Sequence, residues 1–375
     1  MKCKKKAIFL KNSSKPIPRV IRMIKVADDL NYDVLFVGAY RKEDDVESEV
    51  WDGINIKRVG RYYPPLNGKK IFTLIFSLFF LNLRMLRELF SEKPELIHAS
   101  DIETAVPALI YSKIRSVPVI YNIHDNLHER YPINDFFRYF LRIFESFFIL
   151  LFDVTIVPEE FRKHSYSMKC QSKIKVVKNS PDVSTHERDD LQKSFIDKNK
   201  IKILYAGWLD NGRGIDHLLS LSKHNNVEIT IAGLGDPQFL EKIKTLNNVV
   251  YKGFISHDEI LNLTKETDFV YAAYDPVRKI NIYAASNKIA ESLFFGKPVI
   301  SNVEMEISKL LKSYDCCVSF NYSDFSQVYN DLCELKSEPE SYKKLSNNAI
   351  SLYYEQYSWE MVEKSIKDVF KMIGN

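Results

Sequence analysis

The chain has 375 residues, more than one hydrophobic core usually supports, so its length predicts two domains. Hydrophobic residues make up 45% and charged residues 27%, ordinary values for a globular protein that exclude wholesale disorder and collagen-like repeats. The net charge of +4 is unevenly divided: residues 1–185 carry 30 Lys and Arg against 22 Asp and Glu, whereas residues 186–375 carry 23 Lys and Arg against 27 Asp and Glu. The basic first half is therefore suited to an anionic partner.

The cysteines and the start of the chain indicate a compartment. The five cysteines form no C-x-x-C pair, and their odd number is typical of free thiols rather than of disulfides or a zinc site. Only four apolar residues precede Lys11, fewer than a signal peptide requires. The sequence therefore predicts a cytoplasmic protein, with the inner face of the cell membrane as an alternative location.

Short apolar runs alternate with amphipathic stretches, the pattern of parallel sheets with crossover helices. In the first half the predicted helix is 19–30, and the predicted strands are 7–10, 33–38, 96–98, 118–122, 154–157 and 174–177. A polar and charged stretch then interrupts the pattern. A second series follows, with predicted strands at 201–206, 227–232, 249–251, 269–272, 298–300 and 317–320.

This alternation predicts an α/β chain of two facing, doubly wound, Rossmann-like domains, with ligands near the carboxyl ends of the strands. The predicted boundaries are an N-terminal domain at 1–182, a linker at 183–200, a C-terminal domain at 201–355 and a last helix at 356–375.

Two apolar segments, 71–81 and 136–152, are rich in Phe and flanked or interrupted by basic residues. Neither reaches the ~20 uncharged residues that a transmembrane helix needs. Three interpretations stay open: buried core helices, a dimer face, or peripheral contact of 69–87 and 136–152 with an anionic membrane.

Glycines follow the first two predicted strands of the second half. Gly207 and Gly212-Arg213-Gly214 precede a helix that opens at Ile215, where backbone amides can form an anion site and Arg213 supplies a cation. A tight turn with a solvated arginine is the alternative. Gly233 follows the next strand, but Gln238 breaks the G-x-G-x-x-G fingerprint, so a turn is favoured there.

The densest stretch is 284–300. Ser286 and Asn287 are natural N-caps of a helix whose start can hold phosphate, with Lys288 adding charge. Glu291, one turn inside the helix, can accept two hydrogen bonds from ribose hydroxyls. A glutamate that only complements the helix dipole is the alternative.

His124 and His128 have the i, i+4 spacing of a metal pair, but Asp125 stands where a zinc motif has Glu and the pair follows a strand, so a metal site is disfavoured. His124 is a candidate for a polar contact with substrate, with a structural histidine as the alternative. The absence of a P-loop, a G-x-S-x-G elbow and a basic strand face with interleaved aromatics argues against ATPase, acyl-enzyme hydrolase and nucleic-acid-binding functions.

Taken together, these segments resemble glycosyltransferase family 4, a retaining family with a GT-B fold of two facing Rossmann-like domains. Residues 287–300 are similar to its S-x-N/K-h-x-E-x-h-x-x-G-K-P-V-I segment, and 206–215 to its G-x-L-x-x-x-R/K-G-I loop. Further similarities, in the right order, are at 18–20, 121–125, 231–235, 249–253 and 357–360. The resemblance covers nearly the whole chain and implies that the last helix crosses back to the first domain.

The resemblance also implies roles for individual residues. The loop around Arg213 would grip the donor diphosphate, Glu291 would bind the ribose, and His124 would face the donor sugar. The implied catalytic residues are His124, Arg213 and Lys288, and the implied donor-binding residues are Gly207, Arg213, Gly233, Tyr283, Ser286, Asn287, Lys288, Ile289 and Glu291.

Three features depart from the family pattern. The first glutamate of the E-x7-E motif, which normally touches the donor sugar, is replaced by Tyr283. The arginine that often follows the first glycine of the phosphate loop is Trp208, and residues 12–18 replace a glycine-rich first loop. These departures bear on sugar identity, catalytic detail and acceptor contacts.

The implied function is retaining transfer of a hexose-type sugar from a nucleoside diphosphate sugar to a hydroxyl of a glycan or lipid-linked acceptor, in cell-surface polysaccharide or lipopolysaccharide synthesis. No metal or other cofactor is required by this scheme, no D-x-D pair lies in a suitable loop, and no nucleic-acid partner is expected. Two alternatives stay open. One is a catalytically silent scaffold that binds sugar nucleotides, which Tyr283 and Trp208 favour, and the other is a sugar-nucleotide epimerase on a similar fold.

Overall fold

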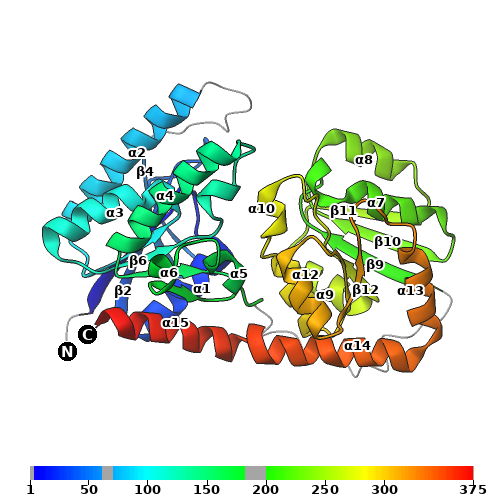
Figure 1. Cartoon of the computed structure of the whole chain (residues 1–375). Helices are drawn as coiled ribbons and strands as arrows, with labels where there is room; N and C mark the ends of the chain where they lie inside the picture. The colour runs from blue at the N-terminus through cyan, green and yellow to red at the C-terminus, as the bar shows by residue number, and fades with distance from the viewer. Residues whose placement is uncertain (1–3, 61–70, 182–199, 375) are drawn as a thin grey trace. The chain divides into compact units, whose positions relative to one another are not determined.

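The computed structural model describes residues 4–60, 71–181 and 200–374 (Figure 1). The chain divides into two compact units: unit 1 is Met1–Lys178 together with Glu363–Asn375, and unit 2 is Asn179–Val362. Each unit has its own β-sheet and its own hydrophobic core. Apart from Lys200, the predicted linker at 183–200 lies outside the described residues.

Within the described residues, unit 1 holds an eight-stranded sheet in the order β3-β4-β2-β1-β5-β6-β7-β8, in which only β3 is antiparallel to its neighbour. Each strand predicted in the first half is present. The strands are β1 (Lys5–Leu10), β2 (Tyr32–Ala39), β3 (Ser48–Trp51), β4 (Ile54–Val59), β5 (Leu96–Ser100), β6 (Val119–Asn122), β7 (Val154–Val157) and β8 (Ile174–Val176).

The hairpin of β3 and β4 was not predicted. Asp52 and Gly53 form its two-residue turn with φ of 49° and 74°, the backbone that such hairpin loops favour. The Asp-Gly pair between two alternating runs was the signal available in the sequence.

Helices cover both faces of the unit 1 sheet (Figure 1). They are α1 (Pro18–Asp29), α2 (Ile71–Glu92), α3 (Ile102–Arg115), α4 (Asp135–Leu151), and the short α5 (Glu160–Lys163) and α6 (Met168–Gln171). Crossovers between parallel strands are right-handed. The connections that contain α2, α3 and α4 run along the sheet from β4 towards β7, so these helices lie on one face. The connection that contains α1 runs from β1 to β2, in the opposite direction, so α1 lies on the other face.

The packing agrees with this handedness. Ile8 and Leu10 of β1 share a core with buried side chains of α2, α3 and α4. Phe9, on the other side of the same strand, stacks on His98, whose Nε2 lies 3.2 Å from Sδ of Met23 in α1. A strand covered on both faces explains why the β1 sequence is apolar without alternation.

The interpretation of 71–81 and 136–152 as buried core helices is wrong for the outer sides of both. α2 and α4 bury one side each against the sheet and expose the other, and α3 between them also exposes apolar side chains. We call this surface the aromatic face. It consists of Ile75, Phe76, Phe79, Phe80 and Leu83 of α2, Val106, Ile110 and Ile114 of α3, and Phe136, Phe137, Tyr139, Phe140, Ile143, Phe144 and Phe147 of α4.

Within the described residues, unit 2 holds a parallel six-stranded sheet in the order β11-β10-β9-β12-β13-β14, and each strand predicted in the second half is present. The strands are β9 (Ile201–Ala206), β10 (Val227–Ala232), β11 (Val249–Gly253), β12 (Phe269–Tyr271), β13 (Val299–Asn302) and β14 (Cys317–Phe320). The order reverses at β9 and β12, and the carboxyl ends of strands at such a point are the usual binding place in open α/β sheets.

The helices after β9 include two short ones near this point, α10 (Lys279–Ile282) and α11 (Asn287–Phe294). The others are α7 (Ile215–Ser220), α8 (Pro237–Lys244), α9 (His257–Glu266), α12 (Glu306–Ser313), α13 (Val328–Ser337), α14 (Pro339–Leu352) and α15 (Trp359–Gly374). From Glu363 onwards α15 belongs to unit 1, where Phe370 packs against Tyr32. No helix in the described parts of the chain is both long and apolar enough to span a bilayer.

Candidate functional site

The carboxyl ends of β9 and β10 meet through two glycines. Gly233 has φ of 134°, and a Cβ added to it would lie 1.9 Å from the carbonyl oxygen of Gly207. A Cβ on Gly207 would in turn lie 3.3 Å from Nζ of Lys288. Gly233 is therefore needed for a close backbone approach, and Gly207 borders a lysine from a helix far along the chain.

Arg213 is held by the loop that follows β9. The Asp210 carboxylate accepts a hydrogen bond of 2.7 Å from the amide of Gly212, and the Asn281 side chain donates one of 3.0 Å to the Gly212 carbonyl. Gly214 has φ of 60°, and its carbonyl accepts a 2.7 Å hydrogen bond from the buried Tyr271 hydroxyl. These bonds fix the backbone on both sides of Arg213 in a tight turn.

Two cations converge on two tyrosines. The Arg213 guanidinium lies 4.8 Å from the ring centroid of Tyr274, and Nζ of Lys288 lies 4.0 Å from the ring of Tyr205 and 5.6 Å from that of Tyr274. Tyr274 also receives hydrogen bonds from Ser286 and Arg213. Cations over aromatic faces are attracted by the ring quadrupole, so the rings hold both charges in place without neutralising them.

The pKa shifts report the same electrostatics. Burial alone would raise the pKa of the Tyr274 hydroxyl, but the charges of Lys288 and Arg213 outweigh it and lower that pKa. Burial also lowers the pKa of Lys288; Arg213 lowers it further, while Tyr274 and Glu291 oppose the shift. The site is therefore electropositive and partly buried, a setting in which an anion binds more strongly than in open water.

The amino-terminal turn of α11 borders this pair of cations. Ser286 occupies the N-cap position, but its side chain forms no capping bond and instead contacts Tyr274. Asn287 is exposed at the first helical position. Ile289 is buried, and its amide donates to the Ser286 carbonyl at 3.2 Å, so it contributes to the packing of the first turn.

Glu291 lies one turn inside α11, as predicted from the sequence. Its carboxylate is only 6% exposed, and Oε1 lies 3.0 Å from Nε2 of His257, the first residue of α9. Complementing the helix dipole needs no such partner. A buried carboxylate with a half-exposed histidine beside it can exchange that partner for hydroxyl groups of a ligand.

Two of the three departures from the family pattern, Tyr283 and Trp208, lie in unit 2. Tyr283 is half-buried directly after α10. Trp208 is exposed, and its carbonyl accepts a hydrogen bond from the hydroxyl of Tyr205. Neither adds a charge to the site, so Arg213 and Lys288 supply its positive charge.

His124 belongs to unit 1, at the carboxyl end of β6. Its amide donates a 2.9 Å hydrogen bond to Asp101, a carboxylate that also pairs with Lys11 at 3.1 Å and Arg130 at 2.7 Å. Burial lowers the pKa of His124 to about 3, so the ring is neutral at physiological pH. Its Nε2 is buried and has no hydrogen-bond partner among the described residues.

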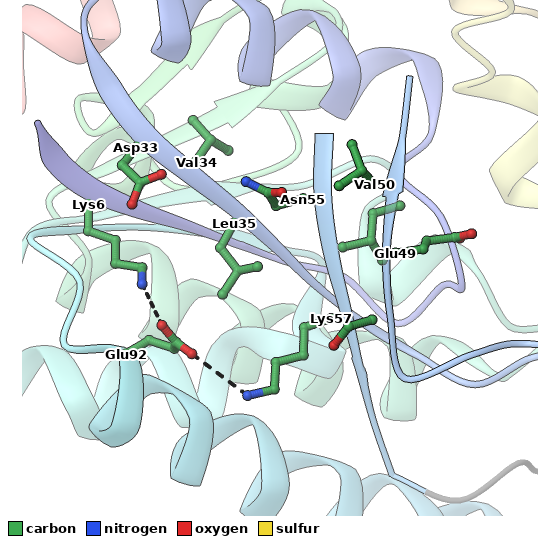
Figure 2. A pocket seen from close by; sticks show the side chains of 11 residues that line it. Lys6, Asp33, Val34, Leu35, Glu49, Val50, Asn55, Lys57 and Glu92 are labelled. Carbon is green, nitrogen blue, oxygen red and sulfur yellow. Dashed lines mark hydrogen bonds and ion pairs between the residues drawn. The ribbon is translucent and has the colours of Figure 1, made fainter. Parts of the chain in front are cut away.

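A separate surface hollow of about 410 Å³ lies beside β3 and β4 in unit 1, and none of the predicted site residues lines it (Figure 2). Both lysines of its lining form ion pairs: Lys6 with Glu92, and Lys57 with Glu92 at 3.7 Å and with Glu88, outside the lining, at 2.6 Å. The positive charges of the hollow are therefore neutralised, so it is not the candidate site for an anionic ligand. No group of three His, Cys, Asp or Glu side chains in the described residues is arranged to hold a metal ion.

Sequence reasoning missed Tyr274, Tyr205, His257 and Asp101. Tyr274 follows the predicted strand at 269–272 and Asp101 follows β5, so their places at strand ends were an available signal. His257 had none, because its role depends on the packing of α9 against α11.

Comparisons with known proteins show which proteins the chain is similar to. Residues 19–185 match the family model described as Glycosyltransferase Family 4. Sucrose-phosphate synthase from Thermosynechococcus elongatus superposes with a TM-score of 0.78 at 13% identity, covering 99% of both chains. Anabaena HepE, solved in complex with UDP-glucose, gives 0.71 at 16% identity over 98% of this chain and 99% of its own. WaaG, a glycosyltransferase involved in lipopolysaccharide biosynthesis, gives 0.67 at 11% identity over 97% and 99%.

A relative in sequence is the uncharacterized glycosyltransferase MJ1607 of Methanocaldococcus jannaschii, 23% identical over 221 residues, which are 54% of this chain and 55% of that protein. The chain spans about half the length of the curated relatives it matches. The fold is that of the GT-B glycosyltransferases. Within that class, residues 19–185 of the chain are similar to Glycosyltransferase Family 4.

Proposed function

We propose that the protein is a retaining glycosyltransferase that moves a hexose-type sugar from a nucleoside diphosphate sugar to an acceptor hydroxyl. The convergence of Arg213 and Lys288 beside the first turn of α11, with buried Glu291 one turn further on, supports this proposal. That spacing suits a ligand with a diphosphate and a ribose. UDP-glucose, with which HepE was solved in complex, has this chemistry.

The proposed reaction has a barrier that these residues lower. The bond between the anomeric carbon and the diphosphate oxygen breaks as the bond to the acceptor oxygen forms, and negative charge develops on the leaving diphosphate. Arg213 and Lys288 stabilise that charge in a partly buried site, where a fixed cation is more effective than in open water. In a retaining scheme the departing phosphate oxygen is the candidate base for the acceptor proton.

Glu291 and His124 have binding roles in this scheme. Glu291 accepts hydrogen bonds from the ribose hydroxyls after His257 gives up its contact. His124, neutral and with Nε2 unpartnered among the described residues, contacts a hydroxyl of the sugar or acceptor. No step in the scheme uses a metal.

For the acceptor we propose a lipid-linked glycan in cell-surface polysaccharide synthesis, with the enzyme at the inner face of the cell membrane. The involvement of WaaG in lipopolysaccharide biosynthesis and the exposed aromatic face of unit 1 support this acceptor.

The donor site is tested by calorimetric titration of UDP and GDP into the wild type and Glu291→Gln. The variant keeps the size of the side chain and loses the charge that strengthens its hydrogen bonds to ribose, so the preferred nucleotide should bind roughly 10- to 100-fold more weakly. Glu306→Gln is the matched control, because Glu306 lies in the first turn of the next helix and pairs with Lys309 at 2.7 Å. Equal binding by wild type and Glu291→Gln would contradict the ribose role.

Products distinguish the remaining functions. A transferase releases nucleoside diphosphate from its sugar donor, slowly to water and faster with acceptor. A scaffold, the alternative that Tyr283 favours, binds the donor and releases nothing. An epimerase interconverts the free donor without an acceptor.

A further inference from the structure

Asp101 lies between the end of β5 and the start of α3, in a backbone conformation that is rare for any residue other than glycine. Its φ is 62° and its ψ is 172°. A residue with a Cβ is strained at these angles and keeps them only where surrounding contacts hold it. Backbone outliers of this kind cluster at functional sites, so the role of Asp101 follows from the contacts that hold it.

The Asp101 carboxylate does not form the bond that is usual at its position. An aspartate at the N-cap of a helix commonly accepts a hydrogen bond from an amide of the first turn, but the Asp101 side chain forms no such bond with α3. It reaches the neighbouring strand end instead, where Oδ1 accepts a 2.9 Å hydrogen bond from the His124 amide. The backbone supports this reach, since the Asp101 amide donates to the carbonyl of Asn122, the last residue of β6, at 2.9 Å.

Two cations hold the carboxylate in place. Nζ of Lys11 lies 3.1 Å from Oδ2 of Asp101, and Nη2 of Arg130 lies 2.7 Å from Oδ1. Arg130 also bonds the chain beyond His124, because its Nε donates to the Asp125 carbonyl at 3.2 Å. The side chains of Asp101, Lys11 and Arg130 are each at most 16% exposed, so water competes little with these bonds. The backbone is thus held before and after the His124 ring.

A turn that served only the fold would not need this aspartate. Glycine adopts the same backbone angles without strain, so glycine at position 101 would stabilise such a turn better. What the aspartate adds is a carboxylate aimed at the amide of His124. Nε2 of the His124 ring has no hydrogen-bond partner among the described residues, so this atom does not anchor the ring, and the ring takes its place from the backbone that carries it.

We infer that Asp101 is a positioning residue, which holds His124 where its ring contacts a hydroxyl of the sugar or acceptor. The inference rests on the proposed function, because that contact of His124 belongs to the proposed scheme. A displacement of about 1 Å in a group that contacts substrate can lower a rate by about 10²-fold. Loss of the Asp101 carboxylate should therefore lower turnover roughly 10- to 100-fold.

Two replacements of Asp101 and a matched control test this role. Asp101→Asn keeps the size of the side chain and tolerates a positive φ, but loses the charge that pairs with Lys11 and Arg130. Asp101→Gly loses the carboxylate and suits the backbone, so it is the variant to use if the asparagine does not fold. The control is Asp153→Asn, because the Asp153 carboxylate accepts a 2.8 Å hydrogen bond from the amide of Val119 at the other end of β6.

The first readout is turnover. Release of nucleoside diphosphate from UDP-glucose, or from GDP-glucose if GDP is the nucleotide that binds, should fall roughly 10- to 100-fold in both Asp101 variants. Calorimetric affinity for the free nucleotide should stay near wild type, because the residues proposed to bind it belong to unit 2. In the His124→Gln background, Asp101→Gly should lower turnover by less than about twofold more, since a residue that acts through His124 has no further effect once that ring is gone.

The second readout is the ring of His124 itself. In protein with isotope-labelled histidines, its NMR signal is assigned by its absence from His124→Gln. Both Asp101 variants should move this signal and leave that of His217, in unit 2, unchanged. Asp153→Asn should leave both signals in place.

The inference is overturned if either Asp101 variant keeps wild-type turnover, if the His124 signal does not move, or if Asp153→Asn loses as much turnover. It is also overturned if the losses of Asp101→Gly and His124→Gln multiply in the double variant, because Asp101 would then act independently of that ring. Failure of the proposed function is a different result: the wild type then releases no nucleoside diphosphate, while the His124 signal still shows whether Asp101 holds the ring.

Discussion

Replacing Lys288 with Met removes one charge from the proposed diphosphate site and keeps the length and apolar stem of the side chain. Nζ of Lys288 lies 4.0 Å from the Tyr205 ring and beside the bare backbone of Gly207, where a ligand oxygen can approach without meeting a side chain. A hydrogen bond to a charged group contributes about 1.5–3 kcal/mol. UDP or GDP, whichever binds, should therefore bind roughly 10- to 150-fold more weakly to Lys288→Met.

The turnover should fall further than the affinity if Lys288 also stabilises the leaving group. A donor that acts mainly in the transition state contributes roughly 10²- to 10³-fold in kcat. The assay is calorimetric titration of nucleotide together with release of nucleoside diphosphate from the sugar donor. Lys279→Met, at an exposed position of α10, is the control for loss of a positive charge. Wild-type affinity and turnover in Lys288→Met would refute the assignment of the site.

Two further readouts follow from the pKa shifts around Lys288. Because burial lowers the pKa of Lys288, nucleotide affinity should decline on the alkaline side at a lower pH than for an ordinary lysine, and Lys288→Arg should move that decline upwards. Removing the charge should also raise the pKa of Tyr274, which ultraviolet absorbance of tyrosinate detects. A pKa of Tyr274 unchanged in Lys288→Met would contradict the contact.

Three other outcomes are expected. Gly233→Ala should lower the free energy of unfolding by about 2–4 kcal/mol, because its Cβ would overlap the Gly207 carbonyl. Gly253→Ala, at φ of 68° with open space around the Cβ, should lower it by only about 1–2 kcal/mol. Chemical denaturation of the two variants compares these values. Burial lowers the pKa of His98 to about 3. Between pH 6.5 and 3 His98 is therefore protonated in the unfolded chain but not in the folded chain. This difference should lower the free energy of unfolding by about 2 kcal/mol at pH 5. His98→Gln should remove that part of the acid sensitivity in thermal unfolding, and an unchanged pH dependence would contradict it. Turnover should survive treatment with EDTA, since the proposed scheme assigns charge stabilisation to side chains; a loss that Mg²⁺ or Mn²⁺ restores would disprove the metal-free scheme.

Much of the fold was readable from the sequence because parallel strands buried on both faces leave a strong signal. Short continuous apolar runs such as that of β1, repeated between amphipathic stretches, are typical of such strands. The hairpin of β3 and β4 was missed although Asp52-Gly53 marks its turn, because its strands are short and alternate in polarity and β3 lies at the sheet edge.

The candidate site was predictable where its chemistry lies in one local segment. Arg213 between two glycines and Glu291 one turn into a helix are local patterns, and their spacing to strand ends limits what they can do. Tyr274 and His257 act through contacts with residues distant in the chain. The only local signal for Tyr274 was its place at a strand end, and His257 had none.

The sequence by itself determined the strand series, the loops that follow β9 and β10, and the helix that carries Lys288 and Glu291, because hydrophobic periodicity and backbone requirements are local properties of a chain. Only the tertiary structure decided that Arg213 and Lys288 meet over Tyr274, and that α2 and α4 are exposed on their outer sides. A Phe-rich segment has the same composition in a core as on a surface; which of its faces is covered depends on the right-handed crossovers that place it against the sheet, and these are set by the whole topology.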